Sequence, residues 1–204
     1  MVSPPAGRQA QKDATRLRIL EVARLHFERH GFADASVRGI AADAGVAVGT
    51  VLLHFSDKLS LLHAALHDDL EAAIRRSLRT PSRGLLLDRL CAVVRPFYSY
   101  YDARPQLSRV LLRESLLAES PWRERFSEQL LRVNGHVAAL VAEAKTAGEL
   151  PARCDAGVFA LAFASFYYFA LIGWVQGAVA SPLPLFKKLM AQHIASSAPE
   201  SHPT

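Results

Sequence analysis

The stretch GVAVGTVLLHFSDK, residues 45–58, decides the fold. Its first residue, Gly45, follows a short segment with helical periodicity that opens at Ser36, and a glycine there permits the tight turn that joins two helices. Ala41 is small enough for the two helices to cross closely. The residues expected to fix the angle between them are Ile40, Ala44, Val46, Val51 and Phe55. This spacing predicts a helix-turn-helix motif whose second helix covers residues 47 to 53.

The second helix of this motif poses a question about DNA binding. From Gly45 to Phe55 the chain contains no Lys, Arg, Asn or Gln, although helix-turn-helix motifs typically bind DNA, a polyanion. The formal net charge of +5 fits a nucleic-acid partner but does not prove one. The charge and the hydrogen-bond donors must therefore come from segments around the second helix.

The rest of the chain has helical periodicity almost throughout, which predicts an all-α fold of about nine helices. The helices are expected to begin near Asp13 or Ala14, at 36, 47 and 57, and then at Leu85, Pro105, Pro121, Asp155 and Pro184. Their expected last residues are 31, 44, 53, 79, 101, 117, 147, 180 and 195. Residues 1–11 and 198–204 are rich in Pro, Ser, Ala and Gly, and we expect both to be loose tails.

The sequence lacks the parts of an enzyme or a metal site. Cys91 and Cys154 are the only thiols and have no CxxC spacing, so neither a disulfide framework nor a zinc site is expected. The pairs His26/His30 and His63/His67 are four residues apart, but no third ligand or HExxH glutamate accompanies them, which favours exposed helix histidines. No Gly-rich phosphate loop or GxSxG elbow occurs. We expect no enzymatic activity, no metal and no cofactor, and a cytoplasmic protein, since residues 1–11 lack the apolar segment of a secretory signal.

Residues 15–62, TRLRILEVARLHFERHGFADASVRGIAADAGVAVGTVLLHFSDKLSLL, resemble the N-terminal domain of the TetR family of bacterial transcriptional regulators. The matching positions are Ile19, Ala23, Phe27, Gly31-Phe32, Ser36-Val37, Ile40-Ala41, Gly45-Val46, Gly49-Thr50, His54-Phe55 and Lys58. The later helices, with RPQLSRVLLRESL at 104–116, are similar to that family's less specific ligand and dimer domain. The resemblance implies a helix-turn-helix DNA-binding domain over 12–56 and a helical ligand-binding and dimerisation domain over 57–197.

In the family the third helix lies in the major groove, and the starts of the second and fourth helices hold phosphates. Carried over by position, Ser36 and the amide of Val37 are the phosphate anchors. Arg38 is the candidate for a base edge, because an arginine can bond O6 and N7 of guanine together. The alternative for Arg38 is a solvated helix residue.

The same resemblance assigns roles on and after the third helix. Val48 and Gly49 lie at its start, where a glycine lets the backbone approach the sugar-phosphate surface. Thr50 offers a hydroxyl to phosphate or a methyl to thymine, and His54 is expected to donate to a phosphate. Lys58 stands in the first turn of the fourth helix, where the helix dipole disfavours a cation unless a phosphate docks there.

One departure from the family lies in the third helix. Leu52 and Leu53 occupy positions where members commonly carry aromatic residues, often Tyr. Leu52 would either pack against a thymine methyl or sugar edge, or belong to the core of the small domain; both interpretations stay open. The loss of an aromatic contact could weaken operator binding or shift it to the basic residues of the N-terminal arm, which could equally be a solvated terminus. Those residues are Arg8, Lys12, Arg16 and Arg18.

Residues 158–180 form an uncharged run of 23 residues, which is long enough to cross a bilayer. A helix that is apolar all round can instead lie between its own core and a partner chain. We favour the second interpretation, a homodimer through residues 155–195, whose two recognition helices would meet successive major grooves of a palindromic site. A membrane-anchored DNA-binding or adaptor protein is the alternative.

Aromatic residues gather in the middle and late helices, where the resemblance implies an inducer site. Most such residues are expected to be core, and any pocket should be mainly apolar with few polar groups. The candidate ligand contacts are Phe97, Tyr101, Arg113, Trp122, Phe126, Phe163 and Tyr167. The predicted function is therefore a homodimeric repressor that is released from a palindromic operator by a small, largely apolar ligand.

Overall fold

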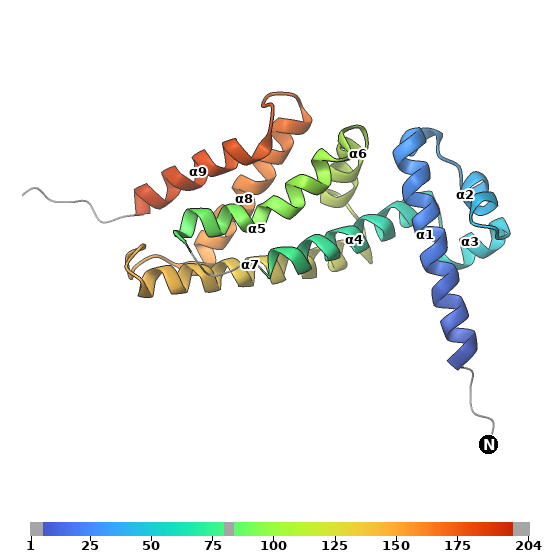
Figure 1. The fold of residues 1–204 in the computed structure, drawn as a ribbon, viewed down its shortest axis with the longest axis horizontal. Coiled ribbons are helices and arrows are strands. Elements are labelled where there is room, and N and C mark those ends of the chain that lie inside the picture. The colour runs from blue at the N-terminus through green and yellow to red at the C-terminus, as the bar shows by residue number, and fades with distance from the viewer. Residues whose placement is uncertain (1–5, 80–83, 198–204) are drawn as a thin grey trace, which may run out of the picture. The chain divides into compact units, whose positions relative to one another are not determined.

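The computed structural model describes residues 6–79 and 84–197, and within these ranges the chain forms nine α-helices and no strand (Figure 1). The predicted all-α class is therefore confirmed. The helices are α1 (Ala6–Asp34), α2 (Val37–Asp43), α3 (Val48–His54), α4 (Lys58–Ser77), α5 (Leu86–Asp102), α6 (Pro105–Leu116), α7 (Trp122–Thr146), α8 (Ala156–Val175) and α9 (Pro182–Ser197).

Several helix ends differ from the prediction, most of all those of α1 and α8. The α1 helix begins at Ala6, so residues 6–11 are helical and not a loose tail. The α8 helix ends at Val175, five residues early, because Gly177 adopts a φ of 77° and its amide donates back to the carbonyl of Trp174 at 2.9 Å. This backbone bond terminates a helix. The α9 helix begins at Pro182 instead of Pro184. The expected tail at 198–204 lies outside the described residues.

The chain divides into two compact units, and the division does not follow the predicted boundary at residue 57. One unit contains the residues up to Asp69 together with Gln106–Arg123; the other contains Leu70–Pro105 and the chain from Glu124 onward. The first half of α4 and nearly all of α6 thus belong with the helix-turn-helix. We describe each unit separately.

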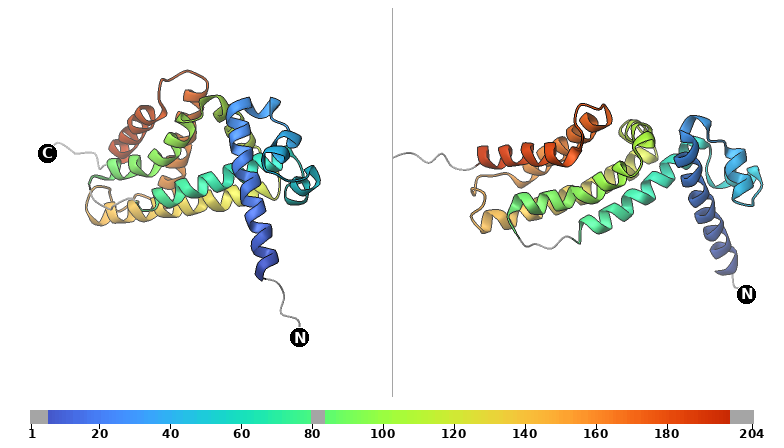
Figure 2. Two further views of the ribbon diagram at one scale, coloured as in Figure 1. Left: turned by 45° about the vertical axis from the view of Figure 1, so that its right-hand side comes forward. Right: turned by 45° about the horizontal axis from the view of Figure 1, so that its top comes forward.

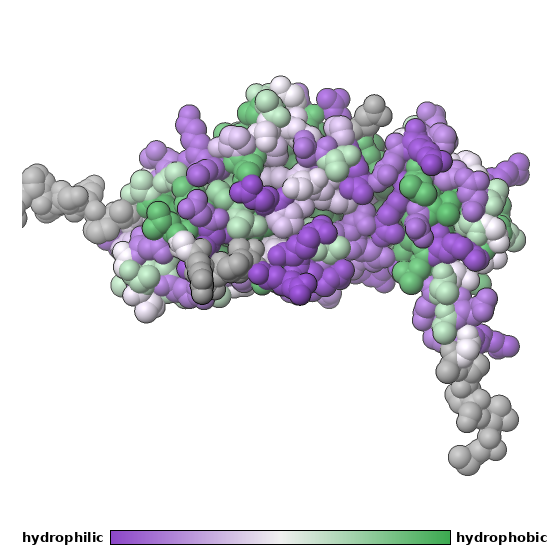
Figure 3. All heavy atoms as spheres, in the orientation of Figure 1, coloured by the Kyte–Doolittle hydropathy of each residue, from purple (hydrophilic) through white to green (hydrophobic). Residues whose placement is uncertain are grey.

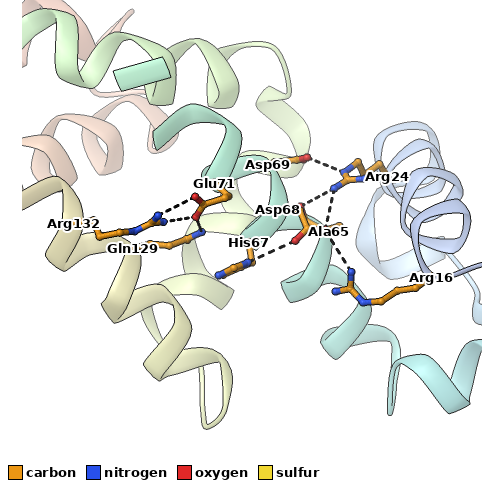
Figure 4. Close-up of polar contacts among 9 residues, drawn as sticks. All are labelled: Arg16, Arg24, Ala65, His67, Asp68, Asp69, Glu71, Gln129 and Arg132. Atoms are coloured by element: carbon orange, nitrogen blue, oxygen red, sulfur yellow. Dashed lines mark hydrogen bonds and ion pairs between the residues drawn. The ribbon is translucent and has the colours of Figure 1, made fainter. Parts of the chain in front are cut away.

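In the first unit, α1 supports both helices of the motif and is tied to α4. Its core includes the fully buried Ile19, Leu20 and Phe27. The guanidinium of Arg24 in α1 pairs with Asp69 of α4 at 2.8 Å and lies 3.9 Å from Asp68 (Figure 4). These charged contacts hold the first half of α4 against α1.

The α6 segment joins this unit through two histidines of α4. His63 is buried, and its Nε2 lies 3.2 Å from the backbone carbonyl of Glu114. The ring of Trp122 packs against His63 and His67, with centroids 5.8 and 6.0 Å apart. Burial lowers the pKa of His63, which favours the neutral ring at pH 7. The pair His63/His67 thus serves packing, and His63 is not the exposed histidine that the sequence suggested.

In the second unit, α9 packs against α5 and α8 (Figure 2). The Phe186 ring of α9 lies 5.3 Å from Phe163 and 6.2 Å from Tyr98. Ser77, the last residue of α4, donates from its hydroxyl to the carbonyl of Val93 at 2.9 Å. Aromatic rings and this hydrogen bond thus hold α4, α5, α8 and α9 together in the second unit.

The α8 helix also exposes apolar side chains. Val158, Leu161 and Phe169 are each more than 60% exposed. Among the described residues, α8 is the single helix long and apolar enough to cross a membrane, and the bent pair α2 and α3 would count as a second span by composition. Length and composition alone thus do not separate a membrane span from a helix that another chain covers.

Within the second unit, Glu71 of α4 is held by α7. Arg132 donates from both terminal nitrogens to the two carboxylate oxygens, and Gln129 donates to one of them at 3.2 Å (Figure 4). The hydrogen bonds from Arg132, more than that from Gln129, hold the pKa of Glu71 below its ordinary 4.5.

We expect Glu71→Gln to lower the free energy of unfolding at pH 7 by less than about 1 kcal/mol, because solvent screens a half-exposed ion pair. A lowered carboxyl pKa stabilises the folded chain fully above pH 4.5 and loses its effect as the pH falls further. Urea unfolding should therefore show wild type and variant converging between pH 5 and pH 3. Glu21→Gln, at an exposed position of α1, is the control. A difference that is unchanged by pH would contradict this account.

Candidate nucleic-acid interface

The turn between α2 and α3 is closed by backbone hydrogen bonds. Gly45 has a φ of 63°, its amide donates to the carbonyl of Ala42, and the amide of Val46 donates to that of Ala41, both at 3.0 Å. This pair of bonds is the Schellman motif, which favours glycine because its central residue has a positive φ. The chain bends by 105° between α2 and α3, within the roughly 90–120° of helix-turn-helix motifs.

The start of α2 is fixed by Ser36 and its neighbours. The Ser36 Oγ accepts the amide of Gly39 at 3.0 Å, as predicted for an N-cap, and its own hydroxyl hydrogen can still donate. A Cβ at Gly39 would lie 3.1 Å from the His26 ring and 3.2 Å from the Ser36 Oγ. The glycine therefore allows α2 to approach α1 closely.

His26 holds α2 to α1, a role that the sequence did not indicate. Its Nε2 lies 2.7 Å from the Asp43 carboxylate at the end of α2. The sequence favoured an exposed histidine at this position, whereas the His26 side chain is 13% exposed and pairs with an acid 17 residues away. No pattern in the sequence signals such a contact between helices.

Arg38 projects from this unit as a free cation. Its side chain is exposed and makes no hydrogen bond or ion pair within the described part of the chain. Val37 beside it is half-buried. Gly49 of α3 is exposed, and a Cβ there would meet no atom within 4 Å. The backbone at Gly49 is thus open to close approach from outside, while Thr50 is half-buried.

The α3 helix separates a buried face from an exposed apolar face. Val51 is 1% exposed and Phe55 4%, whereas Val48, Leu52 and Leu53 are 39%, 47% and 79% exposed. On the face shown in Figure 3, hydrophobic surface lies among polar surface over α2 and α3. Of the two interpretations of Leu52, a place in the core is therefore wrong.

Basic residues of α1 lie near the end of α3. Burial lowers the pKa of half-buried His54, and the positive charges of Lys12 and Arg16 lower it further. Arg16 is itself occupied: its guanidinium lies over the Phe55 ring at 5.5 Å and 3.9 Å from Asp68. The other cation, Lys12, is exposed and has no hydrogen bond or ion pair within residues 6–79 and 84–197.

The structure gives Lys58 partners within the protein. Its ammonium donates to the carbonyls of Ala33 and Ala35, each at 3.0 Å, and lies 4.7 Å from the centroid of the Phe32 ring. Two of its three N–H groups are used in this way. Its charge thus stabilises the segment between α1 and α2, close to the break in α1 at Gly31, where φ is 72°. One N–H group remains, so a phosphate contact by Lys58 stays a prediction.

Lys58→Met keeps the length of the side chain but removes the ammonium. We expect it to destabilise the first unit by about 1–2 kcal/mol, because two charged hydrogen bonds are lost and two carbonyls lose their donor. Thermal unfolding would detect this change. Lys187→Met, which removes an exposed lysine 3.7 Å from Asp88, should leave the melting temperature within about 1 °C. Equal effects of the two substitutions would mean that the Lys58 contacts contribute nothing.

Four of the seven candidate ligand residues lie in α5 and α8 of the second unit. The Phe97 ring is 5.9 Å from Tyr167, and Tyr101 shares a hydrogen bond with Tyr167. Tyr98, which sequence reasoning missed, stacks on Tyr167 at 5.3 Å and donates to its carbonyl at 3.2 Å. Burial raises the pKa of each of these tyrosines, which stay neutral. Phe163 packs instead on Phe186 of α9.

The other three candidates lie in α6 and α7. Arg113 and Trp122 belong to the first unit, where Arg113 pairs with the adjacent Glu114 at 2.8 Å and Trp122 packs on the histidines of α4. Phe126 is half-buried in α7. Phe97, Tyr98, Tyr101 and Tyr167 therefore form one group of packed rings, and their role in a ligand pocket stays a prediction.

Comparison with known proteins identifies relatives of the helix-turn-helix unit. Residues 19–65 match the family described as bacterial regulatory proteins, tetR family. The regulator UidR of Escherichia coli K12 is 36% identical over 77 residues, which are 38% of this chain and 39% of UidR. The regulator SrpR of Pseudomonas putida is 29% identical over 150 residues, or 72% of this chain and 68% of SrpR. The match thus spans about two fifths of UidR and about two thirds of SrpR.

Solved structures share the fold over most of the chain. A TetR transcription regulator from Haloarcula marismortui superposes with a TM-score of 0.72 at 16% identity, covering 91% of this chain and 98% of its own. The regulator FadR of Bacillus subtilis, solved in complex with stearoyl-CoA, gives 0.69 at 19% identity, covering 90% and 99%. At such identities the likeness concerns the fold alone.

Proposed function

Because this chain belongs to the TetR family of DNA-binding transcription regulators, we propose that it is a homodimeric repressor that a small, largely apolar ligand releases from a palindromic operator. Its family consists of regulators and not of enzymes. The observation that carries the proposal is the exposed surface around the 105° bend between α2 and α3, where Ser36, Arg38 and Gly49 are accessible.

Contacts to DNA are proposed at two levels. The Ser36 hydroxyl, the Val37 amide, Thr50 and His54 would hold phosphates, which fixes the register without reading sequence. Arg38 would read a base edge, with Val48, Gly49 and Leu52 at the groove. The free Lys12 would add a phosphate contact near His54.

A second copy of the chain would cover the exposed apolar face of α8, with α9 beside it. Two-fold symmetry would then present two recognition helices to one palindrome. The alternative is that α8 anchors the protein in a membrane. Fractionation without detergent decides between the two: a cytoplasmic dimer stays in the supernatant and elutes at twice the mass of the chain, whereas an anchored protein sediments with membranes.

The ring cluster around Tyr167 would form one side of the ligand site. The solved FadR complex holds stearoyl-CoA, so long-chain acyl thioesters are the first class of ligand to test. A ligand that binds the folded chain raises its melting temperature. Stearoyl-CoA should do so and should also weaken DNA binding; stabilisation without loss of DNA binding would contradict release by this class.

An electrophoretic gel-shift experiment tests the main proposal. The DNA flanking the gene, offered to the folded protein at about 100 mM salt, should be retarded, and excess unrelated DNA should not abolish the complex. The logarithm of the association constant should fall linearly with that of the salt concentration, by about 0.9 per phosphate contact. A folded dimer that retards no fragment specifically, even from a random pool, would refute the proposal.

A further inference from the structure

The exposed face of α3 lacks hydrogen-bonding side chains. Val48 and Leu52 are four residues apart, as are Gly49 and Leu53, so the four residues form two adjacent rows along the helix. All four are exposed, and Leu53 at 79% is one of the most exposed large apolar side chains among the described residues. The buried Val51 lies on the opposite side of α3 and shows which way the helix faces. The side of α3 that would face the base edges in a DNA complex therefore carries two solvent-exposed leucines.

This surface fits one feature of the major groove in particular. Thymine presents its C5 methyl group there, whereas a G·C pair presents two acceptors and a donor. A leucine over a G·C pair would leave those polar groups without partners. A leucine over a thymine removes apolar surface of both from water. The same side chains thus favour thymine and disfavour guanine and cytosine.

The charges around this face fit DNA as its occupant. Lys12 and Arg16 are close enough to His54 to lower its pKa, and the free Arg38 is on α2, the helix that contacts α3. An apolar strip bordered by cations complements a groove whose floor carries methyl groups and whose edges are rows of phosphates.

We propose that Leu52 and Leu53 read the operator by covering the C5 methyl groups of thymines, so that a methyl group sets the sequence preference of positions that face α3. The inference rests on the proposed DNA-binding function and adds to it the chemical class of the base that is read. Hydrogen-bond readout is left to Arg38, beside this face. The selected operator should accordingly contain thymine at one or two fixed positions of each half-site.

Replacing thymine by deoxyuridine removes the methyl group and keeps the base pairing and the O4 acceptor. The probe is a fluorescein-labelled duplex recovered by selection from a random pool, with each thymine replaced in turn and affinity measured by anisotropy. We expect about a four-fold loss for each covered methyl group and no change at other thymines. Leu52→Ala or Leu53→Ala should weaken binding to the thymine duplex and abolish the effect of deoxyuridine at the same position.

Leu131→Ala is the matched control, since it truncates a leucine of α7 that is 68% exposed and should keep the full deoxyuridine effect. Because Leu52 and Leu53 are exposed, the variants should fold, which circular dichroism checks. Insensitivity of the wild type to deoxyuridine at every position, or an unchanged effect in both leucine variants, overturns the inference while DNA binding stands. If selection with folded wild type recovers no sequence, the proposed function fails as well.

Discussion

Arg38→Ala is expected to weaken binding to the selected operator by about 10- to 100-fold while the protein keeps its stability. A bidentate arginine contact to guanine contributes about 1–3 kcal/mol of discrimination, and Arg38 has no partner within the described residues whose loss would unsettle the fold. Anisotropy with specific and random duplexes would measure both affinity and specificity. The loss should be largest for the specific duplex, so the ratio between the two should fall.

A matched variant separates this role from simple charge. Arg76→Ala removes an exposed arginine of α4 in the second unit and changes the net charge equally, so it should alter affinity by less than about two-fold. Arg38→Lys keeps the charge without the bidentate geometry, so its binding to the specific duplex should stay weaker than that of wild type. If Arg38→Ala and Arg76→Ala weaken specific and random DNA equally, Arg38 is a solvated helix residue.

Phe27→Ala is expected to abolish DNA binding by the opposite route, through loss of structure. Phe27 is 1% exposed in α1, and its ring lies 5.8 Å from that of Phe32. Truncating such a phenylalanine costs about 3–5 kcal/mol, a large part of the stability of a domain. Urea unfolding followed by circular dichroism should show the loss, together with binding that disappears for specific and random DNA alike.

Leu25→Ala is the control for this substitution. Leu25 is two residues away on the same helix but 45% exposed, so its truncation should cost less than about 0.5 kcal/mol and leave DNA binding intact. A Phe27→Ala protein that is as stable as wild type and still binds would show that α1 does not support the motif as described.

The helix-turn-helix could be predicted because its determinants are local. A glycine at 45, a capping serine at 36 and apolar residues at helical spacing act within a few residues of one another, and the structure has each in the expected place. The ends of α1 and α8 were less predictable. Whether a helix continues at Ala6 or stops before Gly177 depends on small differences between competing backbone states.

In the candidate site, too, the features set by neighbouring residues were predicted and those set by distant residues were not. Arg38 and Gly49 are exposed as the motif implied, since their places on α2 and α3 follow from periodicity. The contacts of Lys58 within the protein were not predicted because its partners, the carbonyls of Ala33 and Ala35, are 25 and 23 residues away. A dipole argument within α4 could not include these carbonyls. The pairing of His26 with Asp43 was missed for the same reason.

The sequence by itself determined the helical class and the turn at Gly45, since turn chemistry and periodicity are properties of neighbouring residues. The proposal that α3 reads DNA follows from the resemblance to the TetR family. The tertiary structure alone decided that Leu52 and Leu53 face outward, that Lys58 binds the chain itself and that Gln106–Arg123 belongs with the helix-turn-helix. Those outcomes depend on which distant segments pack together. The packing of distant segments depends on the apolar surface that the chain as a whole removes from water, and no local pattern of residues specifies it.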